Sequence, residues 1–416
     1  MKLKKLLFIF LVFLTFYSCL EPFDATVGDK ANSLLVVDGL ISNEEIPYTV
    51  RLTRTVSNID QGIIPVTGAT VTIEDHLGLK TVLTETEDGI YETDPDEFVG
   101  MPGNEYRLSI KTKEGKRYQS ELCKMPQPSE IDEVYFAPGN ETESIETSGF
   151  NGVGMYISGH VNSDDVEYLR WSFNEDWKFQ VPFGPDEIPA PCDEMVPVIQ
   201  KKYCWKSSIS NEILLQSFNS QTERKVQDKE LYFINTELTD KLLIRYSSLI
   251  KQYSISREEY DFWRKMEMAN PDVGDIFGEQ PFAVTGNIKR IDNPDEKVLG
   301  YFQVAGCATK RIYINFGEVH ELKLPMFNSY ARCSYDSLML DKLNAGSDPE
   351  NPAYECIYDI YDEFVLSGKY GYDYAFPILA GGFSEKVIGL ALTTPKCTDC
   401  TLAGDLNPPD FWSETE

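Results

Sequence analysis

The stretch that decides the fold is Tyr48-Thr49-Val50-Arg51-Leu52-Thr53-Arg54, in which apolar and polar side chains alternate. Residues 69–75 repeat the pattern, and Gly78 and Asp88-Gly89 supply turn signals nearby. A period of two places the apolar side chains on one face of a β-strand. Short alternating strands at about ten-residue spacing are typical of a β-sandwich, so we predict one at residues 34–125.

Residues 65–71, followed by Asp88-Gly89-Ile90-Tyr91, resemble the Ig-like sandwiches of the transthyretin-like or carboxypeptidase-regulatory kind. Two prolines between 124 and 130 predict a linker after this domain. Further alternating runs indicate a larger β-rich domain with a few helices at 130–416. Ser256 and Glu259 form a capping-box pattern that predicts a helix near 257–269. The predicted fold class is therefore mainly β.

The N-terminus has the pattern of an export signal. Three lysines among the first five residues precede an apolar run at 6–14, and Thr15-Phe16-Tyr17-Ser18 lead from this run to Cys19. The run is too short for a stable membrane span. Its approach to Cys19 resembles a bacterial lipoprotein signal, which implies cleavage after residues 1–18 and lipid attachment at Cys19. Residues 19–33 would then form a tether.

The charge of the chain argues against polyanionic partners. The formal net charge is −29 at pH 7, so nucleic acid is excluded as an expected partner. Anionic headgroups would be repelled as well, so membrane attachment is expected through the lipid rather than through a basic surface.

Eight cysteines remain besides Cys19, and an even number in an exported chain predicts disulfides. The candidates are Cys192, Cys204, Cys333, Cys356, Cys397 and Cys400. Local spacing favours Cys192 with Cys204, or Cys333 with Cys356. Cys397-x-x-Cys400 is interpreted as structural, bonded within the pair or each to another cysteine, rather than as a redox or zinc site.

Signs of catalysis are few. The sequence contains no His-Glu-x-x-His, Gly-x-Ser-x-Gly or Walker motif, and only three histidines. We therefore predict no enzyme, no catalytic residue, no metal site and no cofactor. Among the aromatic residues, Trp177, Trp205 and Trp412 lie beside polar loops and are the candidate exposed binding contacts.

An ordered set of motifs resembles one family. The set is Cys204-Trp205, Arg245-Tyr246, Gln252-Tyr253-Ser254-Ile255-Ser256, Tyr260-Asp261-Phe262-Trp263, Gly286-Asn287-Ile288, Val298-Leu299-Gly300-Tyr301-Phe302, Cys397-x-x-Cys400 and Pro409-Asp410-Phe411-Trp412. The family is that of the Bacteroidetes-type lipoproteins catalogued as domain of unknown function 4249. The resemblance implies an outer-membrane lipoprotein, often encoded beside a TonB-dependent receptor, without established catalytic residues.

Three functions follow from these observations. The preferred one is a lipid-anchored outer-membrane protein, facing the cell exterior, that captures a ligand as the accessory partner of a TonB-dependent transporter. The alternative is a non-catalytic structural subunit of an outer-membrane assembly, secretion or adhesion complex, which would need a flat aromatic interface. A hydrolase with paired carboxylates in a cleft ranks last.

Overall fold

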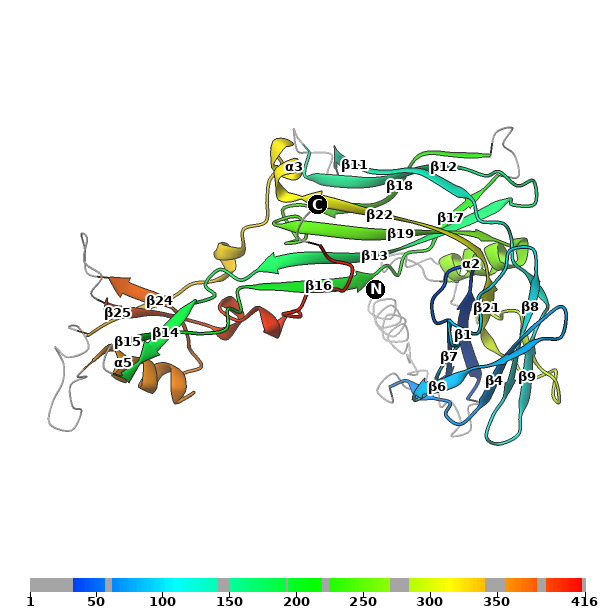
Figure 1. The fold of residues 1–416 in the computed structure, drawn as a ribbon, viewed down its shortest axis with the longest axis horizontal. Helices are drawn as coiled ribbons and strands as arrows, with labels where there is room; N and C mark the ends of the chain where they lie inside the picture. The colour runs from blue at the N-terminus through cyan, green and yellow to red at the C-terminus, as the bar shows by residue number, and fades with distance from the viewer. Residues whose placement is uncertain are drawn as a thin grey trace, which may run out of the picture.

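The fold is taken from a computed structural model. The residues it describes are 33–56, 62–140, 150–191, 194–218, 224–269, 284–340, 356–379 and 387–413. Antiparallel sheets make up most of this part of the chain, which confirms the mainly β prediction. Figure 1 shows a β-sandwich at one end, stacked sheets in the middle and a smaller lobe, here called the arm, at the other end. Cys19 and Cys192 lie outside the described residues.

The sandwich consists of two sheets that enclose one core. The strands of its first sheet are β1 (Leu35–Ile41), β2 (Thr49–Arg54), β3 (Ile64–Pro65), β6 (Thr84–Glu87), β7 (Ile90–Glu92) and β21 (Leu299–Val304). Those of the second are β4 (Thr70–Asp75), β5 (Lys80–Val82), β8 (Glu105–Lys111), β9 (Arg117–Ser120), β10 (Cys123–Lys124) and β20 (Ile288–Arg290). Val50 and Leu52 are buried between the sheets, as the alternation in β2 requires.

Two strands of the sandwich come from far along the chain. β21 pairs in parallel with β1, and β20 pairs antiparallel with β9. The sequence predicts that the sandwich ends at residue 125 and that residues 288–304 belong to the second domain. The structure differs because the first sheet leaves one edge of β1 open, and β21 satisfies its main-chain hydrogen bonds.

The middle of the molecule, here called the central unit, has two facing sheets. Its five-stranded sheet contains β13 (Tyr168–Gln180), β16 (Tyr203–Ile209), β17 (Leu214–Ser217), β19 (Arg245–Ile255) and β22 (Gly306–Asn315). Its three-stranded sheet contains β11 (Glu130–Gly139), β12 (Gly152–His160) and β18 (Lys225–Asn235). Figure 1 shows the two sheets one above the other. Trp171 and Ile250 from the larger sheet and Met155 from the smaller are buried in the core between them.

Helix α2 (Arg257–Ala269) joins the sandwich to the central unit. The Ser256 hydroxyl accepts a hydrogen bond from the Glu259 N–H at 3.2 Å, as the capping pattern predicts. The Tyr260 ring lies 4.6 Å from Tyr168 of β13, and the Phe262 ring lies 4.7 Å from Tyr301 of β21. Because its two faces contact both parts, α2 fixes their relative orientation. None of the helices in the described ranges has the length and apolar character needed to cross a membrane.

The arm is a small sheet with a hairpin and a helix packed beside it. Its elements are β14 (Glu187–Ala190), β15 (Glu194–Pro197), β23 (Asp336–Met339), α5 (Ile357–Tyr361), the π-helix η4 (Asp362–Leu366), β24 (Asp373–Leu379) and β25 (Val387–Thr393). Its own core contains Ile360, Tyr374 and Leu390. The remaining short elements are α3 (Phe316–Glu321) and the 3-10 turns η3 (Ser329–Arg332), η5 (Pro395–Cys397) and η6 (Cys400–Leu402).

Two disulfides link the arm, the central unit and the C-terminal segment. They join Cys204 to Cys400 and Cys333 to Cys397. The pairings favoured by local spacing, Cys192 with Cys204 and Cys333 with Cys356, are therefore wrong, and Cys356 forms no disulfide within the described residues. The physical reason is that the folded chain brings residues 397–400 back against β16. Each cysteine of the Cys-x-x-Cys motif bonds to a distant partner, which was one of the alternatives left open.

Candidate functional site

The three tryptophans predicted as exposed contacts are mostly covered. Trp177 and Trp412 are each only 8% exposed, and Trp205 is half-buried. Trp177 faces the core of the central unit, and its indole N–H donates to Asp240 Oδ1 at 3.0 Å. The prediction of exposure is wrong for Trp177 and Trp412, because a polar sequence neighbourhood does not reveal that another segment covers the side chain.

The structure brings Trp205 and Trp412 together where the C-terminal segment crosses the five-stranded sheet. Their ring centroids are 6.4 Å apart in an edge-to-face arrangement. Main-chain hydrogen bonds between Trp205 and Asp405 hold the segment to β16. The Arg311 guanidinium lies 3.5 Å from the Phe411 ring centroid. Through these contacts the C-terminal segment covers the aromatic rings of the sheet. This aromatic cluster therefore stabilises the fold rather than presenting a ligand site.

An open aromatic groove lies instead at the base of the arm. A recess of about 470 Å³ follows the end of β13 and contains Phe183 and Phe376 in its wall. Tyr330 and Tyr335 contact the same Phe183 ring edge-on, each with its centroid 5.8 Å away. Tyr335 also lies 5.0 Å from Phe376. Both tyrosines are about half exposed, at 52% and 49% respectively. Phe183 and Phe376 line the recess, and Tyr330 and Tyr335 extend its aromatic surface through their contacts with these rings; we call the recess with these four side chains the aromatic groove.

Local sequence and one disulfide position the groove. Pro182 and Pro185 end β13 because neither can donate a main-chain hydrogen bond, and the turn presents Phe183. The Phe183 N–H donates to the Cys397 carbonyl at 2.9 Å. Cys397 is bonded to Cys333, which stands between Tyr330 and Tyr335 in the sequence. The disulfide therefore holds both tyrosines beside Phe183 and makes the groove a rigid surface.

The wall of the groove adds a few polar groups. Asp186, Glu187 and Lys202 line the recess and provide both signs of charge. Tyr374 also belongs to the wall, and burial raises the pKa of its hydroxyl. Within the described residues that hydroxyl has no hydrogen-bond partner. Apolar faces with a few polar groups are typical of binding sites for small ligands or peptide segments.

A cluster on the three-stranded sheet does not form a separate site. Glu130 of β11 stands directly opposite His160 of β12, and Asp132 lies at a bulge beside them. His160 Nδ1 is 2.8 Å from an Asp132 carboxylate oxygen, and this bond raises the pKa of the imidazole. All three side chains are solvent-accessible, and the two carboxylates already bind the imidazole. The cluster is an exposed ion-pair network.

Sequence reasoning missed all four members of the groove. Phe183, Tyr330, Tyr335 and Phe376 come from three segments of the chain and share no spacing. The available signals were indirect, namely the proline-rich run at 181–201 and two tyrosines that flank Cys333. Neither signal identifies the disulfide partner that assembles the groove.

The fold and the groove define a β-sheet protein of several layers with a disulfide-clamped aromatic surface. The family model described as "Domain of unknown function (DUF4249)" matches residues 20–311, and the chain belongs to this family. The match ends within β22, so Tyr330, Tyr335 and Phe376 lie beyond it. No curated protein matches the chain.

Proposed function

We propose that this protein is a non-catalytic lipoprotein of the outer membrane, facing the cell exterior, that captures a ligand for a TonB-dependent transporter. The observation that carries the proposal is the aromatic groove, because rigid and partly exposed aromatic side chains bind ligands at a low cost in conformational entropy. The signal before Cys19 and the resemblance to lipoproteins support the membrane anchor.

The arrangement of the molecule fits this role. The tether would lead from Cys19 into β1, which lies in the sandwich (Figure 1). The arm, and the groove at its base, lie toward the opposite end of the molecule. A ligand in the groove would thus be held away from the anchored end.

The groove favours a ligand with a flat apolar face and some polar groups. Sugar rings and aromatic or proline side chains stack on rings such as Tyr330 and Tyr335. Lys202 and Asp186, both in the wall of the recess, would orient polar groups of the ligand. We therefore propose a carbohydrate or a peptide segment as the ligand class.

A different surface is suited to contact the transporter. Leu77, Leu79 and Val82 lie on the β4–β5 hairpin of the sandwich, and their exposed fractions are 79%, 70% and 63%. Three large apolar side chains exposed on one hairpin indicate a protein-interaction surface. This observation also favours the alternative function, a structural subunit of an outer-membrane complex that needs the hairpin and not the groove.

Copurification with the native anchor tests the proposal. After mild detergent extraction, we expect mass spectrometry to identify a TonB-dependent barrel protein with the wild-type chain. Leu77→Ser/Leu79→Ser should lose this partner, and Cys19→Ser should release the protein from the membrane fraction. Recovery of no outer-membrane barrel with the wild type would refute the proposal.

Groove variants separate the two functions. Tyr330→Ala/Tyr335→Ala should keep the partner but reduce cellular uptake of the substrate of the copurifying transporter. Tyr370→Ala is the matched control, since this arm tyrosine is 42% exposed and lies outside the groove. Unchanged uptake in the double variant would favour the structural subunit.

A further inference from the structure

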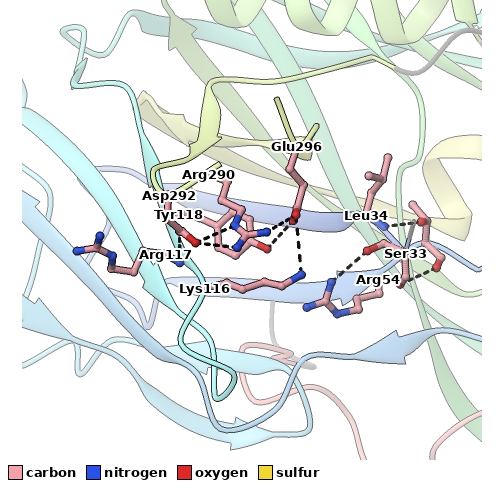
Figure 2. Close-up of polar contacts among 10 residues, drawn as sticks. Ser33, Leu34, Arg54, Lys116, Arg117, Tyr118, Arg290, Asp292 and Glu296 are labelled. Carbon is pink, nitrogen blue, oxygen red and sulfur yellow. Dashed lines mark hydrogen bonds and ion pairs between the residues drawn. The ribbon is translucent and has the colours of Figure 1, made fainter. Parts of the chain in front are cut away.

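The free end of the sandwich contains a charged recess beside the point where the tether would join β1. Its volume is about 630 Å³, and Ser33, Arg54, Lys116, Asp295, Glu296 and Lys297 are part of its wall. The Ser33 hydroxyl donates to the Thr55 carbonyl at 3.2 Å, and Arg54 Nη1 donates to the Ser33 carbonyl at 3.1 Å. These bonds, shown in Figure 2, fix the path of the chain at the rim of the recess.

The charge of Glu296, one of the two acidic groups in the wall, is already neutralised by an ion pair. Glu296 accepts a hydrogen bond from the Tyr118 hydroxyl at 2.8 Å and forms an ion pair with Arg290. Arg290 also binds Asp292 at 2.7 Å, and this bond lowers the pKa of Asp292 to about 2. Figure 2 shows Arg290 between these two carboxylates. Asp295 is the other acid of the wall, and it is solvent-exposed.

The cationic side chains of the wall form few ion pairs with other described residues. Lys116 lies in the turn before β9, and its ammonium group points toward Glu296 at 3.8 Å, a long ion pair (Figure 2). Arg54 and Lys297 make no ion pair with any described residue. The three cations of the wall, Arg54, Lys116 and Lys297, outnumber its two acids by one charge, on a chain of net charge −29. Because salt screens charges beyond about 8 Å, these cations attract an anion bound in the recess, whereas the acidic residues elsewhere on the chain repel it only weakly.

We infer that this recess binds the phosphate of an anionic lipid headgroup, with Arg54 and Lys297 as its main ligands and Lys116 beside them. A guanidinium fork and an ammonium are the side chains suited to phosphate oxygens. The inference rests on the proposed membrane tether, since the 14 peptide units from Cys19 to Ser33 span at most about 50 Å. The headgroup would orient the anchored sandwich on the membrane surface.

The test uses the purified, lipidated full chain in a neutral detergent, without any partner protein. Three probes are titrated by calorimetry: short-chain phosphatidylglycerol, short-chain phosphatidylcholine and inorganic phosphate. We expect phosphatidylglycerol to bind more tightly than the other two. Arg54→Gln/Lys297→Gln should weaken its binding about tenfold or more, the effect of losing a charge-assisted hydrogen bond.

The matched control is Lys80→Gln/Lys289→Gln, which removes the same charge from exposed sandwich positions outside the recess. It should bind as the wild type does. Equal weakening in both double variants would show a general charge effect and overturn the inference. Absence of binding by the wild type would also overturn the inference, as would equal affinity for inorganic phosphate and phosphatidylglycerol.

If the double recess variant unfolds, Lys297→Glu alone should still weaken binding, and unchanged binding would overturn the inference. Failure here leaves copurification of a transporter unaffected, so the two proposals fail separately.

Discussion

Cys204 and Cys400 lie 196 residues apart in the sequence, and their Cα atoms are 5.6 Å apart in a disulfide that ties the C-terminal segment to β16. Three residues before Cys400, Cys397 bonds to Cys333 beside the aromatic groove. The Cys-x-x-Cys motif therefore connects the central sheet and the groove through one short turn. The motif therefore has a structural role in this fold, because it cross-links distant segments.

Cys400→Ser should reduce the free energy of unfolding by about 3–5 kcal/mol, because the cross-link closes a very long loop in the unfolded chain. Urea denaturation under oxidising conditions measures the change. Cys123→Ser is the control, since Cys123 is a free thiol, and it should cost much less. Similar losses in the two variants would contradict a structural role for the disulfide.

Lys241→Met should be strongly destabilising, because it leaves a buried carboxylate without its cation. Lys241 Nζ lies 2.7 and 2.6 Å from the two carboxylate oxygens of Glu175, whose side chain is 6% exposed. Loss of one partner of a buried pair costs about 3–5 kcal/mol. The unfolding free energy should partly recover in Lys241→Met/Glu175→Gln.

Lys289→Met provides the exposed counterpart of that substitution. Its ion pair with Glu121 is 3.0 Å long, but both side chains are more than half exposed. Such pairs contribute about 1 kcal/mol or less. If Lys289→Met cost as much as Lys241→Met, burial would not be the cause of the effect.

Stability should fall as the pH rises through the titration of Glu259. This carboxyl lies on the buried face of α2, and burial raises its pKa from 4.5 to about 7, although the Arg170 guanidinium opposes the shift. Between these values the unfolded chain releases a proton that the folded chain keeps, so folding becomes less favourable as the pH increases. The loss amounts to about 3 kcal/mol and levels off about one pH unit above the pKa of the folded state.

Glu259→Gln should remove that slope. Unfolding free energies below about pH 5 and above about pH 8 test the expectation. Glu258→Gln is the control, since its exposed side chain lies on the same turn of α2. A wild-type slope that survived in Glu259→Gln would show that another group is responsible.

Gly300→Ala should disrupt the pairing of β21 with β1. Gly300 has a φ of +83°, and an added Cβ would lie 1.9 Å from the Val37 carbonyl oxygen. Gly78 has a φ of +86° but no atom within 4 Å of such a Cβ. Gly78→Ala should therefore cost about 1–2 kcal/mol from backbone strain alone.

The steric clash should make Gly300→Ala worse than Gly78→Ala by about 2 kcal/mol or more. Thermal or urea unfolding of both variants gives the comparison. Equal losses of unfolding free energy in the two variants would mean that β1 shifts to make room for the added Cβ. The pairing of β21 with β1 would then not be essential to the sandwich.

Local patterns predicted much of the fold. The alternation in β2 and the capping pattern at Ser256 depend only on residues close in the sequence, and both elements are present. The mainly β class follows from repetition of the first pattern. The family resemblance likewise rests on short ordered motifs.

Only the tertiary structure decided which distant segments meet. It placed β20 and β21 in the sandwich, paired Cys204 with Cys400, and assembled the groove from Phe183, Tyr330, Tyr335 and Phe376. Periodicity reports which face of an element is buried but not which segment covers it. Eight cysteines allow 105 pairings, so spacing could not select the observed ones. Strand edges, thiols and aromatic rings find their partners only when the whole chain has folded.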